Sequence, residues 1–243
     1  MKVFKFGGAS VKDADSVRNV SSVLKYFHND TLIIVVSAMG KVTNALEKLT
    51  SAFFYKKGNS QIILEEIKKF HLDIARDLFP DSTHSIYKDI NAVFFELAQN
   101  INHVPFGSYN KEYDQIVSQG EIISSKIVSA YLNESGIQNT WLDVRDIIQT
   151  DATYREGKVN WENTQGLALP QSHSPSLGRR ENPPIGKGVT VTQGFIGRSP
   201  DGFTTTLGRE GSDYTAAILA YCTNAESVTI WKDVPGVMNA DPK

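Results

Sequence analysis

Cysteine is nearly absent from this chain of 243 residues, in which Cys222 is the only one. A single thiol excludes a disulfide framework and any metal site built from several cysteines. Long apolar runs are also missing, since runs such as Leu32–Val36 fall far short of the ~20 residues that span a bilayer. The chain passes directly into a strand pattern without signal-peptide architecture. We therefore expect a cytoplasmic protein without a membrane partner, and we interpret Cys222 as a buried structural thiol.

Charge is balanced in this sequence. The chain has 25 lysines and arginines against 27 aspartates and glutamates, which gives a formal net charge of -2. No basic face dominates this balance, so we predict no nucleic-acid partner. The five histidines are scattered without the spacing of metal ligands, and no residue is predicted to bind a metal directly. Hydrophobic residues make up 40% of the chain, which suits a soluble protein with a sizeable core.

Strand and helix patterns alternate along the sequence. Short runs typical of buried strands alternate with segments whose apolar residues recur at helical spacing. The predicted strands are Lys2–Phe6, Leu32–Val36, Thr140–Val144, Val189–Val191, Thr204–Leu207 and Val228–Trp231. The predicted helices are 13–27, a segment that begins near Thr43, an amphipathic hairpin over 63–78 and 86–101, Gly120–Leu132, and a segment that begins at Ser212. This order predicts an α/β fold with a mostly parallel sheet and helices on both faces.

Two segments do not fit the alternation. Residues 166–188 have neither period and are crowded with helix and strand breakers, so we interpret them as an irregular loop. The last segment, Trp231–Lys243, has the composition of a polar loop, yet nothing follows it to close a domain. We therefore expect a domain that is incomplete at its C-terminal end.

The segment Thr204–Ala217 carries the strongest functional signal. A β-prone run meets a glycine-bracketed turn that holds Arg209, Ser212 and Asp213, and a helical pattern follows. With Ser212 as the helix N-cap, backbone N–H groups and the arginine side chain would converge at a helix start. The sequence therefore predicts an anion site with a carboxylate beside it, which suits phosphoryl transfer.

A second glycine turn, Gly7–Gly8, follows the first predicted strand. Glycines without Cβ atoms let backbone N–H groups approach phosphate oxygens closely. Lys5 alternates in phase with Val3, so it would point to an apolar face unless a polyanion meets it. The turn matches neither the Walker A nor the dinucleotide-binding pattern. An ordinary tight strand–turn–helix explains it as well as a phosphate site does.

Other polar residues have both a structural and a functional interpretation. Ser37 and Thr43 lie just beyond the carboxyl end of a predicted strand, where ligands bind in open α/β sheets, but they would also serve as helix caps. Glu121 opens a predicted helix, where the helix dipole favours any carboxylate, and it would equally bind an ammonium group. The charged cluster Asp143–Asp146 is interpreted as a solvated salt bridge.

Six motifs together resemble aspartokinase, in the family of amino-acid kinases. In chain order they are Lys5-Phe-Gly-Gly-Ala-Ser10, Val36-Ser-Ala-Met-Gly40 with Thr43-Asn44, Gln119-Gly-Glu121, Thr192-Gln-Gly-Phe195, Thr206-Leu-Gly-Arg-Glu-Gly-Ser-Asp213 and the segment Trp231–Lys243. The resemblance runs from residue 1 to residue 243 with a gap at 166–188. It implies a three-layer α/β/α sandwich and one catalytic domain over 1–243, C-terminally incomplete and without the regulatory ACT domains of the family.

The resemblance also implies an activity. Aspartokinases use ATP and Mg²⁺ to phosphorylate the side-chain carboxylate of L-aspartate, which gives 4-phospho-L-aspartate and ADP, the first step toward lysine, threonine and methionine. The full-length protein would be a homo-oligomer. The alternatives are another amino-acid kinase, acting on glutamate, acetylglutamate or UMP, and a nucleotide-binding fragment with little or no catalysis.

Individual residues are carried over by position. Lys5 is similar to the phosphate-contacting lysine of the family, and Gly7, Gly8 and Ser10 belong to the same phosphate-side turn. The residues that match the aspartate-binding and active-site positions are Ser37, Thr43, Glu121, Arg209, Ser212 and Asp213, and those in the nucleotide loop are Lys232, Asp233, Met238 and Lys243. Lys5 and Asp213 are the expected catalytic residues. The departures are Lys232 for Thr, Met238 for Tyr, Lys243 for Arg, and Glu210 for a small residue.

The chemistry requires no general base. An aspartate side chain has a pKa near ~4 and is already the nucleophilic anion at neutral pH. The protein must instead hold this anion against the triphosphate and align the attack. By this hypothesis Lys5, Mg²⁺ and glycine N–H groups neutralise the phosphate, Arg209 binds the α-carboxylate, and Glu121 binds the ammonium group. Asp213 would position these groups rather than remove a proton.

Overall fold

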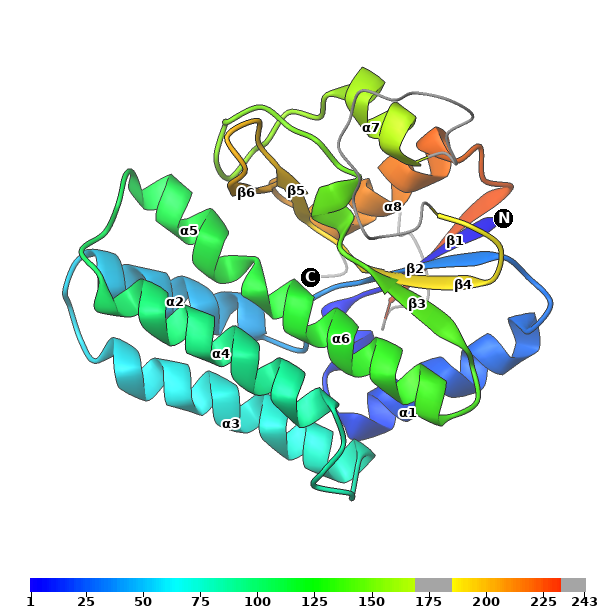
Figure 1. Ribbon diagram of the computed structural model, residues 1–243, viewed down its shortest axis with the longest axis horizontal. Helices are drawn as coiled ribbons and strands as arrows, with labels where there is room; N and C mark the ends of the chain where they lie inside the picture. Colours follow the sequence, from blue (N-terminus) through cyan, green and yellow to red (C-terminus); the bar gives the residue numbers. More distant parts are fainter. Residues whose placement is uncertain (169–184, 233–243) are drawn as a thin grey trace, which may run out of the picture.

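A five-stranded parallel sheet forms the centre of the computed structural model, which describes residues 1–168 and 185–232 (Figure 1). The strands lie in the order β3-β4-β2-β1-β7. Their bounds are β1 (Lys2–Phe6), β2 (Leu32–Val36), β3 (Asn139–Leu142), β4 (Val189–Gln193) and β7 (Ser227–Trp231). The register aligns Phe6 with both Val36 and Trp231, and Val36 with Gln193, so these four strands end side by side. The predicted parallel sheet is confirmed.

Helices cover both faces of the sheet (Figure 1). On one face, α1 (Ala14–Leu24) and α6 (Gln119–Glu134) pack against each other, and α6 contacts β2, β3 and β4. On the other face, α8 (Gly211–Cys222) contacts β1, β2 and β7 and carries α7 (Trp161–Ala168) on its outer side. All residues of β2 are buried, as its continuous apolar run predicts for a strand between two helical layers. The fold is the three-layer α/β/α sandwich.

Four further helices lie beyond the carboxyl ends of the strands (Figure 1). They are α2 (Val42–Phe54), α3 (Ser60–Leu78), α4 (Ile86–Asn102) and α5 (Tyr109–Val117). The first three were predicted from apolar residues at helical spacing, and those residues are buried except Phe70, which is exposed, and Ile63, which is partly buried. The sequence did not predict α5, which is short and buries a tyrosine and an aspartate together with two apolar residues. Its one recognisable signal is Ser108, whose side chain caps the helix by accepting a hydrogen bond from the Lys111 N–H.

Three predictions of secondary structure were wrong in detail. The strand at 204–207 is β6 (Thr204–Thr206), which pairs antiparallel with β5 (Ile196–Arg198) in a separate two-stranded sheet. The chain leaves the main sheet after β4 because Phe195 takes a left-handed backbone conformation, with φ 73°. The strand predicted to end at Val144 ends at Leu142, and a 3₁₀ turn begins at Val144. Residues 166–168 belong to α7, whereas 169–184 of the predicted irregular loop lie outside the described residues.

The charged cluster after β3 is a buried ion pair, so the prediction of a solvated salt bridge was wrong. Arg145 Nη2 lies 2.6 Å from Asp143 Oδ2, and both side chains are largely buried. Arg145 also donates to Thr204 Oγ1 at 3.0 Å, which ties the end of β3 to β6. Burial raises the pKa of Asp143, but the hydrogen bonds and charge of Arg145 outweigh it, and the pKa lies below its ordinary value.

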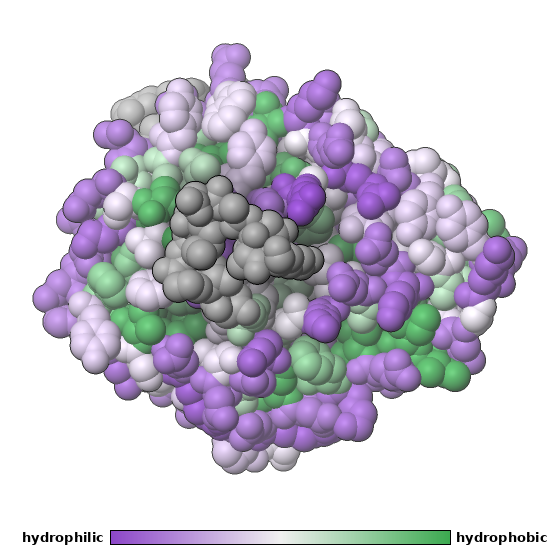
Figure 2. Space-filling model, turned by 180° about the vertical axis from the view of Figure 1, so that it is seen from behind, coloured by the Kyte–Doolittle hydropathy of each residue, from purple (hydrophilic) through white to green (hydrophobic). Residues whose placement is uncertain are grey.

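One face of the molecule is mostly hydrophilic (Figure 2) and the single cysteine is buried, as the composition suggested. Figure 2 shows hydrophilic residues over most of one face of the molecule, with hydrophobic residues in separate patches between them. Cys222 is buried at the end of α8, as predicted, and burial raises the pKa of its thiol. Within 1–168 and 185–232, no helix is both long and apolar enough to cross a membrane.

Candidate active site

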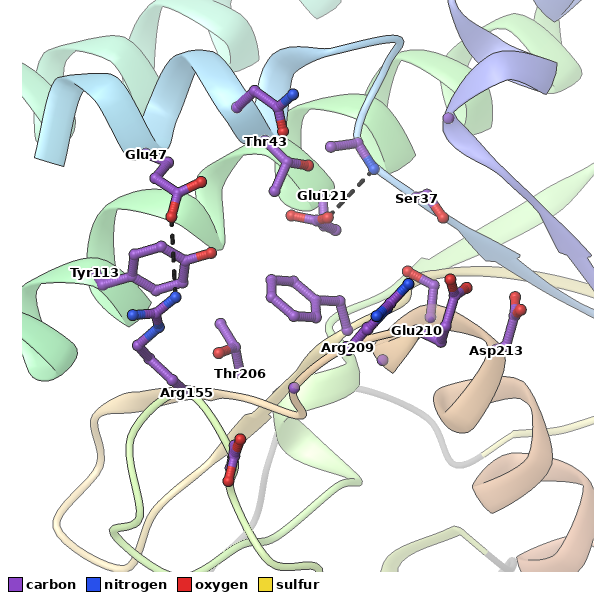
Figure 3. A pocket seen from close by; sticks show the side chains of 18 of the residues that line it. Ser37, Thr43, Glu47, Tyr113, Glu121, Arg155, Thr206, Arg209, Glu210 and Asp213 are labelled. Carbon is purple, nitrogen blue, oxygen red and sulfur yellow. Dashed lines mark hydrogen bonds and ion pairs between the residues drawn. The ribbon is translucent and has the colours of Figure 1, made fainter. Parts of the chain in front are cut away.

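A polar cavity of about 970 Å³ lies at the carboxyl ends of β1, β2 and β4. Helices α2, α5 and α6 line one side of it, and the turn from β6 into α8 lines the other (Figure 3). The residues predicted from sequence that line this cavity are Lys5, Gly8, Ser37, Thr43, Glu121, Arg209, Ser212 and Asp213. Segments from the beginning, middle and end of the chain therefore meet in one pocket.

Two lysines share the carboxylate of Asp213. Lys5 Nζ lies 2.6 Å from Asp213 Oδ1, and Lys232 Nζ lies 2.9 Å from Asp213 Oδ2. Lys232 also lies 3.5 Å from Glu210 Oε2. Burial raises the pKa of Asp213, but the hydrogen bonds and charges of the two lysines outweigh it, so the pKa lies below its ordinary value. Asp213 is thus an anion that holds two cations, and it is poorly suited to accept a proton.

Gly8 sits where a side chain would not fit. A Cβ atom at this position would lie 2.8 Å from the Ala38 carbonyl oxygen and 3.1 Å from that of Gly40. The Gly40 N–H donates to the Gly8 carbonyl at 3.0 Å, so the turns after β1 and β2 are held against each other. The close approach of these turns requires glycine here, and it exposes backbone next to Lys5 at the wall of the pocket.

The remaining predicted residues of the phosphate end lie beside the pocket or outside the described ranges. The Gly7 N–H donates to the Trp231 carbonyl at 3.3 Å, and Ser10 Oγ donates to the same carbonyl at 3.4 Å. These two bonds attach the turn to the end of β7, and neither residue lines the pocket wall. Three nucleotide-loop predictions lie outside the described residues: Asp233, Met238 and Lys243.

Glu121 is a buried carboxylate with one free oxygen. It lies in the first turn of α6, where its Oε1 accepts a hydrogen bond from the Ala38 N–H at 3.4 Å. Within the part of the chain that the structure describes, its Oε2 has no hydrogen-bond partner. Burial raises the pKa of Glu121 to about 8. An acidic group of this kind, facing a cavity, is suited to a cationic donor.

The helix-capping predictions do not hold. Helix α8 begins at Gly211, preceded by Glu210 in a left-handed conformation with φ 56°, so Ser212 lies inside the first turn and is not the N-cap. Ser212 packs closely against Gly194, where an added Cβ atom would lie 2.5 Å from the Ser212 side chain. Thr43 likewise lies inside α2, which begins at Val42. Both side chains are thereby left for the pocket.

Sequence reasoning missed the far end of the pocket. Arg155 Nη2 lies 3.9 Å from Glu47 Oε1, and its guanidinium group lies 4.3 Å from the centre of the Tyr113 ring (Figure 3). Tyr113 belongs to α5, which was not predicted, and Arg155 belongs to a turn without a regular pattern. The other residues of this end are Asn44, Asn110, Thr153, Tyr154 and Glu156.

The fold and the pocket define a class of protein: the chain belongs to the amino acid kinase family, whose match covers residues 1–243. Among its curated relatives, the lysine-sensitive aspartokinase 3 of Escherichia coli (strain K12) is 32% identical over 242 residues, which are 99% of this chain and 51% of that protein. An aspartokinase of Chlamydia trachomatis is 30% identical over 241 residues, or 99% of this chain and 50% of that protein.

Solved structures agree with these relatives. The crystal structure of E. coli aspartokinase III in complex with aspartate and ADP (R-state) matches with a TM-score of 0.82 and 31% identity. The match covers 97% of this chain and 50% of that chain. The chain thus has the amino-acid kinase fold and spans about half the length of these three proteins.

Proposed function

We propose that this chain is the catalytic part of an aspartate kinase, which transfers the terminal phosphoryl group of ATP to the side-chain carboxylate of L-aspartate. The products are 4-phospho-L-aspartate and ADP. The observation that carries the proposal is that Lys5, Glu121, Arg209 and Asp213 line a single cavity. One pocket thereby contains Arg209 for the α-carboxylate of an amino acid, Glu121 for its ammonium group, and Lys5 for a phosphate. The similarity to aspartokinases supports the choice of substrate.

The amino-acid end of the site consists of Glu121, Arg209 and three hydroxyl groups. Arg209 would bind the α-carboxylate, because its planar fork matches a carboxylate. Glu121 would bind the ammonium group with its unpartnered oxygen. Binding of a cation would lower the pKa of Glu121 from about 8 and ionise it. The hydroxyl groups of Ser37, Thr43 and Ser212 line the same cavity and would complete the contacts.

The phosphate end consists of Lys5 and the backbone that follows it. Lys5 would hold the terminal phosphate, and the N–H group of Gly8, which lines the cavity, would approach the phosphate chain. Gly7 and Ser10 would act by fixing this turn, because the Gly7 N–H and Ser10 Oγ donate to the Trp231 carbonyl and the Ser10 N–H donates to the Gly7 carbonyl. We assign the nucleotide loop to Lys232, Asp233, Met238 and Lys243, as the resemblance implies. Among the described residues no group of three or more acidic, histidine or cysteine side chains is placed to hold a metal ion. Mg²⁺ would therefore arrive with the nucleotide phosphates, where it supplies further neutralising charge.

Catalysis in this proposal is positioning and charge neutralisation. The substrate carboxylate is already ionised at neutral pH, so no side chain has to remove a proton. Asp213, with its pKa below the ordinary value, stays ionised and holds Lys5 in place. In the cell the reaction would open the route to lysine, threonine and methionine in the cytoplasm, and the full-length protein would be a homo-oligomer.

A substrate panel tests the proposal. Purified protein is given ATP, Mg²⁺ and either L-aspartate, L-glutamate, N-acetyl-L-glutamate or UMP, and ADP release is followed in a coupled assay. Hydroxylamine traps the acyl phosphate as a hydroxamate, which separates carboxylate phosphorylation from ATP hydrolysis. Among these four acceptors, we expect only L-aspartate to give ADP release and a hydroxamate. ADP release with another acceptor would show that L-aspartate is not the substrate. Nucleotide binding without acceptor-dependent ADP release would show that the chain binds nucleotide but does not catalyse phosphoryl transfer.

A further inference from the structure

Asp114 is a fully buried carboxylate that the proposed chemistry does not use. It lies on α5 and accepts three hydrogen bonds. Its Oδ2 accepts from the Arg155 N–H and from the Thr206 N–H, both at 2.9 Å. Its Oδ1 accepts from Thr206 Oγ1 at 2.7 Å. One side chain therefore joins a helix, the turn that carries Arg155 and the end of β6.

We call this set of contacts between α5, the turn that carries Arg155 and β6 the joint. The side chain of Gln115, next to Asp114 on α5, extends it. Gln115 Nε2 donates to the Thr204 carbonyl at 2.8 Å, and Gln115 Oε1 accepts from the Thr204 N–H at 3.1 Å. The Gly157 N–H donates to the Thr206 carbonyl at 2.8 Å. The edge of β6 that faces away from β5 is thus satisfied by side chains of α5 and by one loop amide. These bonds hold β6 at a fixed position against α5.

The two sides of this joint lead directly to the two ends of the proposed amino-acid site. On one side, β6 ends at Thr206, and Gly208 and Arg209 follow in the pocket wall. On the other side, α5 passes through Ser118 into α6, which carries Glu121. The Ser118 N–H donates to the Asp114 carbonyl at 3.3 Å, so the hydrogen bonding of the helix continues across the junction.

We propose that Asp114 is a positioning residue that fixes Arg209 relative to Glu121 and so sets the affinity of the site for its amino-acid substrate. This inference rests on the proposed function, because it takes Arg209 and Glu121 as the groups that hold the α-carboxylate and the ammonium. It assigns to Asp114 no contact with substrate. Lys5 and Gly8 lie on a different strand and turn, and Lys5 meets the segment after β6 through Asp213 on α8, so the nucleotide end should depend less on Asp114 than the amino-acid end does.

The role depends on hydrogen-bond acceptance rather than on charge. Burial raises the pKa of Asp114 to about 6, and the bonds from Arg155 and Thr206 only partly offset it. The charged and titratable groups near it are Arg155, Tyr113, Tyr154 and, beyond them, Glu47. An asparagine would still accept both backbone N–H bonds with its oxygen, and its NH₂ group would donate to the Thr206 hydroxyl. Asp114→Asn therefore conserves the joint, whereas Asp114→Ala removes it.

The test compares these two variants in the ADP-release assay with L-aspartate and ATP varied separately. For Asp114→Ala we expect the KM for L-aspartate to rise by roughly tenfold or more, because a small displacement of binding groups is costly, while the KM for ATP stays within about twofold. Asp114→Asn should keep the KM for L-aspartate within about threefold of the parent. If Asp114→Ala does not fold, Asp114→Ser, with a shorter side chain, takes its place.

Asn139→Ala is the control for the loss of a partly buried side chain that makes three hydrogen bonds. The Asn139 side chain makes three hydrogen bonds, to Ser129 Oγ at 2.6 Å, the Ser129 carbonyl at 3.1 Å and the Ile137 carbonyl at 3.0 Å, at the other end of the sheet from the pocket. The Asn139→Ala substitution should lower the melting temperature of the protein without changing its KM for L-aspartate. Equal changes in KM for Asn139→Ala and Asp114→Ala, or an unchanged KM in Asp114→Ala, would overturn the inference.

Amide hydrogen exchange separates this inference from the proposed function. The Arg155 and Thr206 amides donate to Asp114, so both should exchange faster in Asp114→Ala than in the parent and in Asp114→Asn. If the parent protein releases no ADP with L-aspartate, the proposed function fails, and the exchange rates still decide on the joint. Equal exchange in all three proteins would show that Asp114 does not hold the two segments.

Discussion

Lys5 and Asp213 join the end of β1 to the first turn of α8 through an ion pair of 2.6 Å between Lys5 Nζ and Asp213 Oδ1. The Lys5 side chain is only 7% exposed, so solvent screens this pair weakly. A lysine ammonium group has three donors, so Lys5 retains donors for a second anion beside the carboxylate of Asp213. Under the proposed function, Lys5 would bind a phosphate while Asp213 keeps its side chain in place.

Replacing Lys5 tests this arrangement directly. Lys5→Met keeps the length of the side chain and removes its charge, so we expect kcat to fall by about 10²–10³-fold or more, the usual effect of removing one donor to developing charge. The fold should persist, since the sheet register does not depend on the ammonium group. Lys2→Met is the matched control, because Lys2 is on the same strand but pairs with Asp30 at 3.1 Å. A Lys5→Met enzyme with the kcat of the parent would contradict the role.

Replacing Arg209 should act on substrate binding. Arg209→Ala removes the cation proposed for the α-carboxylate, so we expect the affinity for L-aspartate to fall by about 2–4 kcal/mol, with the KM for ATP nearly unchanged. Initial rates at saturating ATP measure this effect. Arg18→Ala is the control, because Arg18 pairs with Asp15 and Asp77 on the surface. An unchanged KM for L-aspartate in Arg209→Ala would show that another group binds the α-carboxylate.

The buried carboxyl group of Glu121 predicts a pH dependence of stability. Burial raises its pKa to about 8 in the folded protein, well above the ordinary value of 4.5. The folded state therefore binds more protons than the unfolded state between these two values. The stabilising contribution is fully present below pH 4.5 and is lost as the pH rises through about 8.

Urea unfolding at pH 5 and pH 8 checks this sign. We expect the free energy of unfolding of the parent to fall more between these values than that of Glu121→Gln, by at least about 1.4 kcal/mol, the equivalent of one pKa unit. All other titrating groups are shared by the two proteins, so their difference isolates Glu121. Saturating L-aspartate should reduce the difference between the parent and Glu121→Gln at pH 8, because its ammonium group would stabilise the ionised carboxylate of Glu121. Parallel changes in both proteins would mean that Glu121 is not titrating in this range.

Lys232 and Glu210 should act as a coupled pair. Lys232 lies 2.9 Å from Asp213 and 3.5 Å from Glu210, and its side chain is 41% exposed. We expect Lys232→Thr and Glu210→Ser to be non-additive in a double-mutant cycle of unfolding free energy, with a coupling of about 0.2–1 kcal/mol, as is usual for partly exposed pairs. Strict additivity would show that the two departures from the family pattern are independent.

The strands and most helices were predictable because their signals are local. The β2 run is continuously apolar and buried on both faces, and α1, α3 and α4 show one apolar stripe each. Helix α5 was not predictable in this way. Its stability depends on contacts of Tyr113, Asp114 and Gln115 with segments some 40 to 90 residues away in sequence, which no local pattern reports.

The sequence by itself determined the class of fold and the chemical types of the site residues, since apolar periodicity, glycine turns and charged residues at strand ends are properties of short segments. The tertiary structure decided which of these residues meet. Parallel strands end at one edge of the sheet, and there Lys5 from β1 meets Glu121 from α6 and Arg209 from the turn between β6 and α8 in one cavity. It also decided that Ser212 is no helix cap and that Asp114 joins α5 to β6. Such joints depend on distance in space, and buried polar groups must find their partners wherever the fold places them.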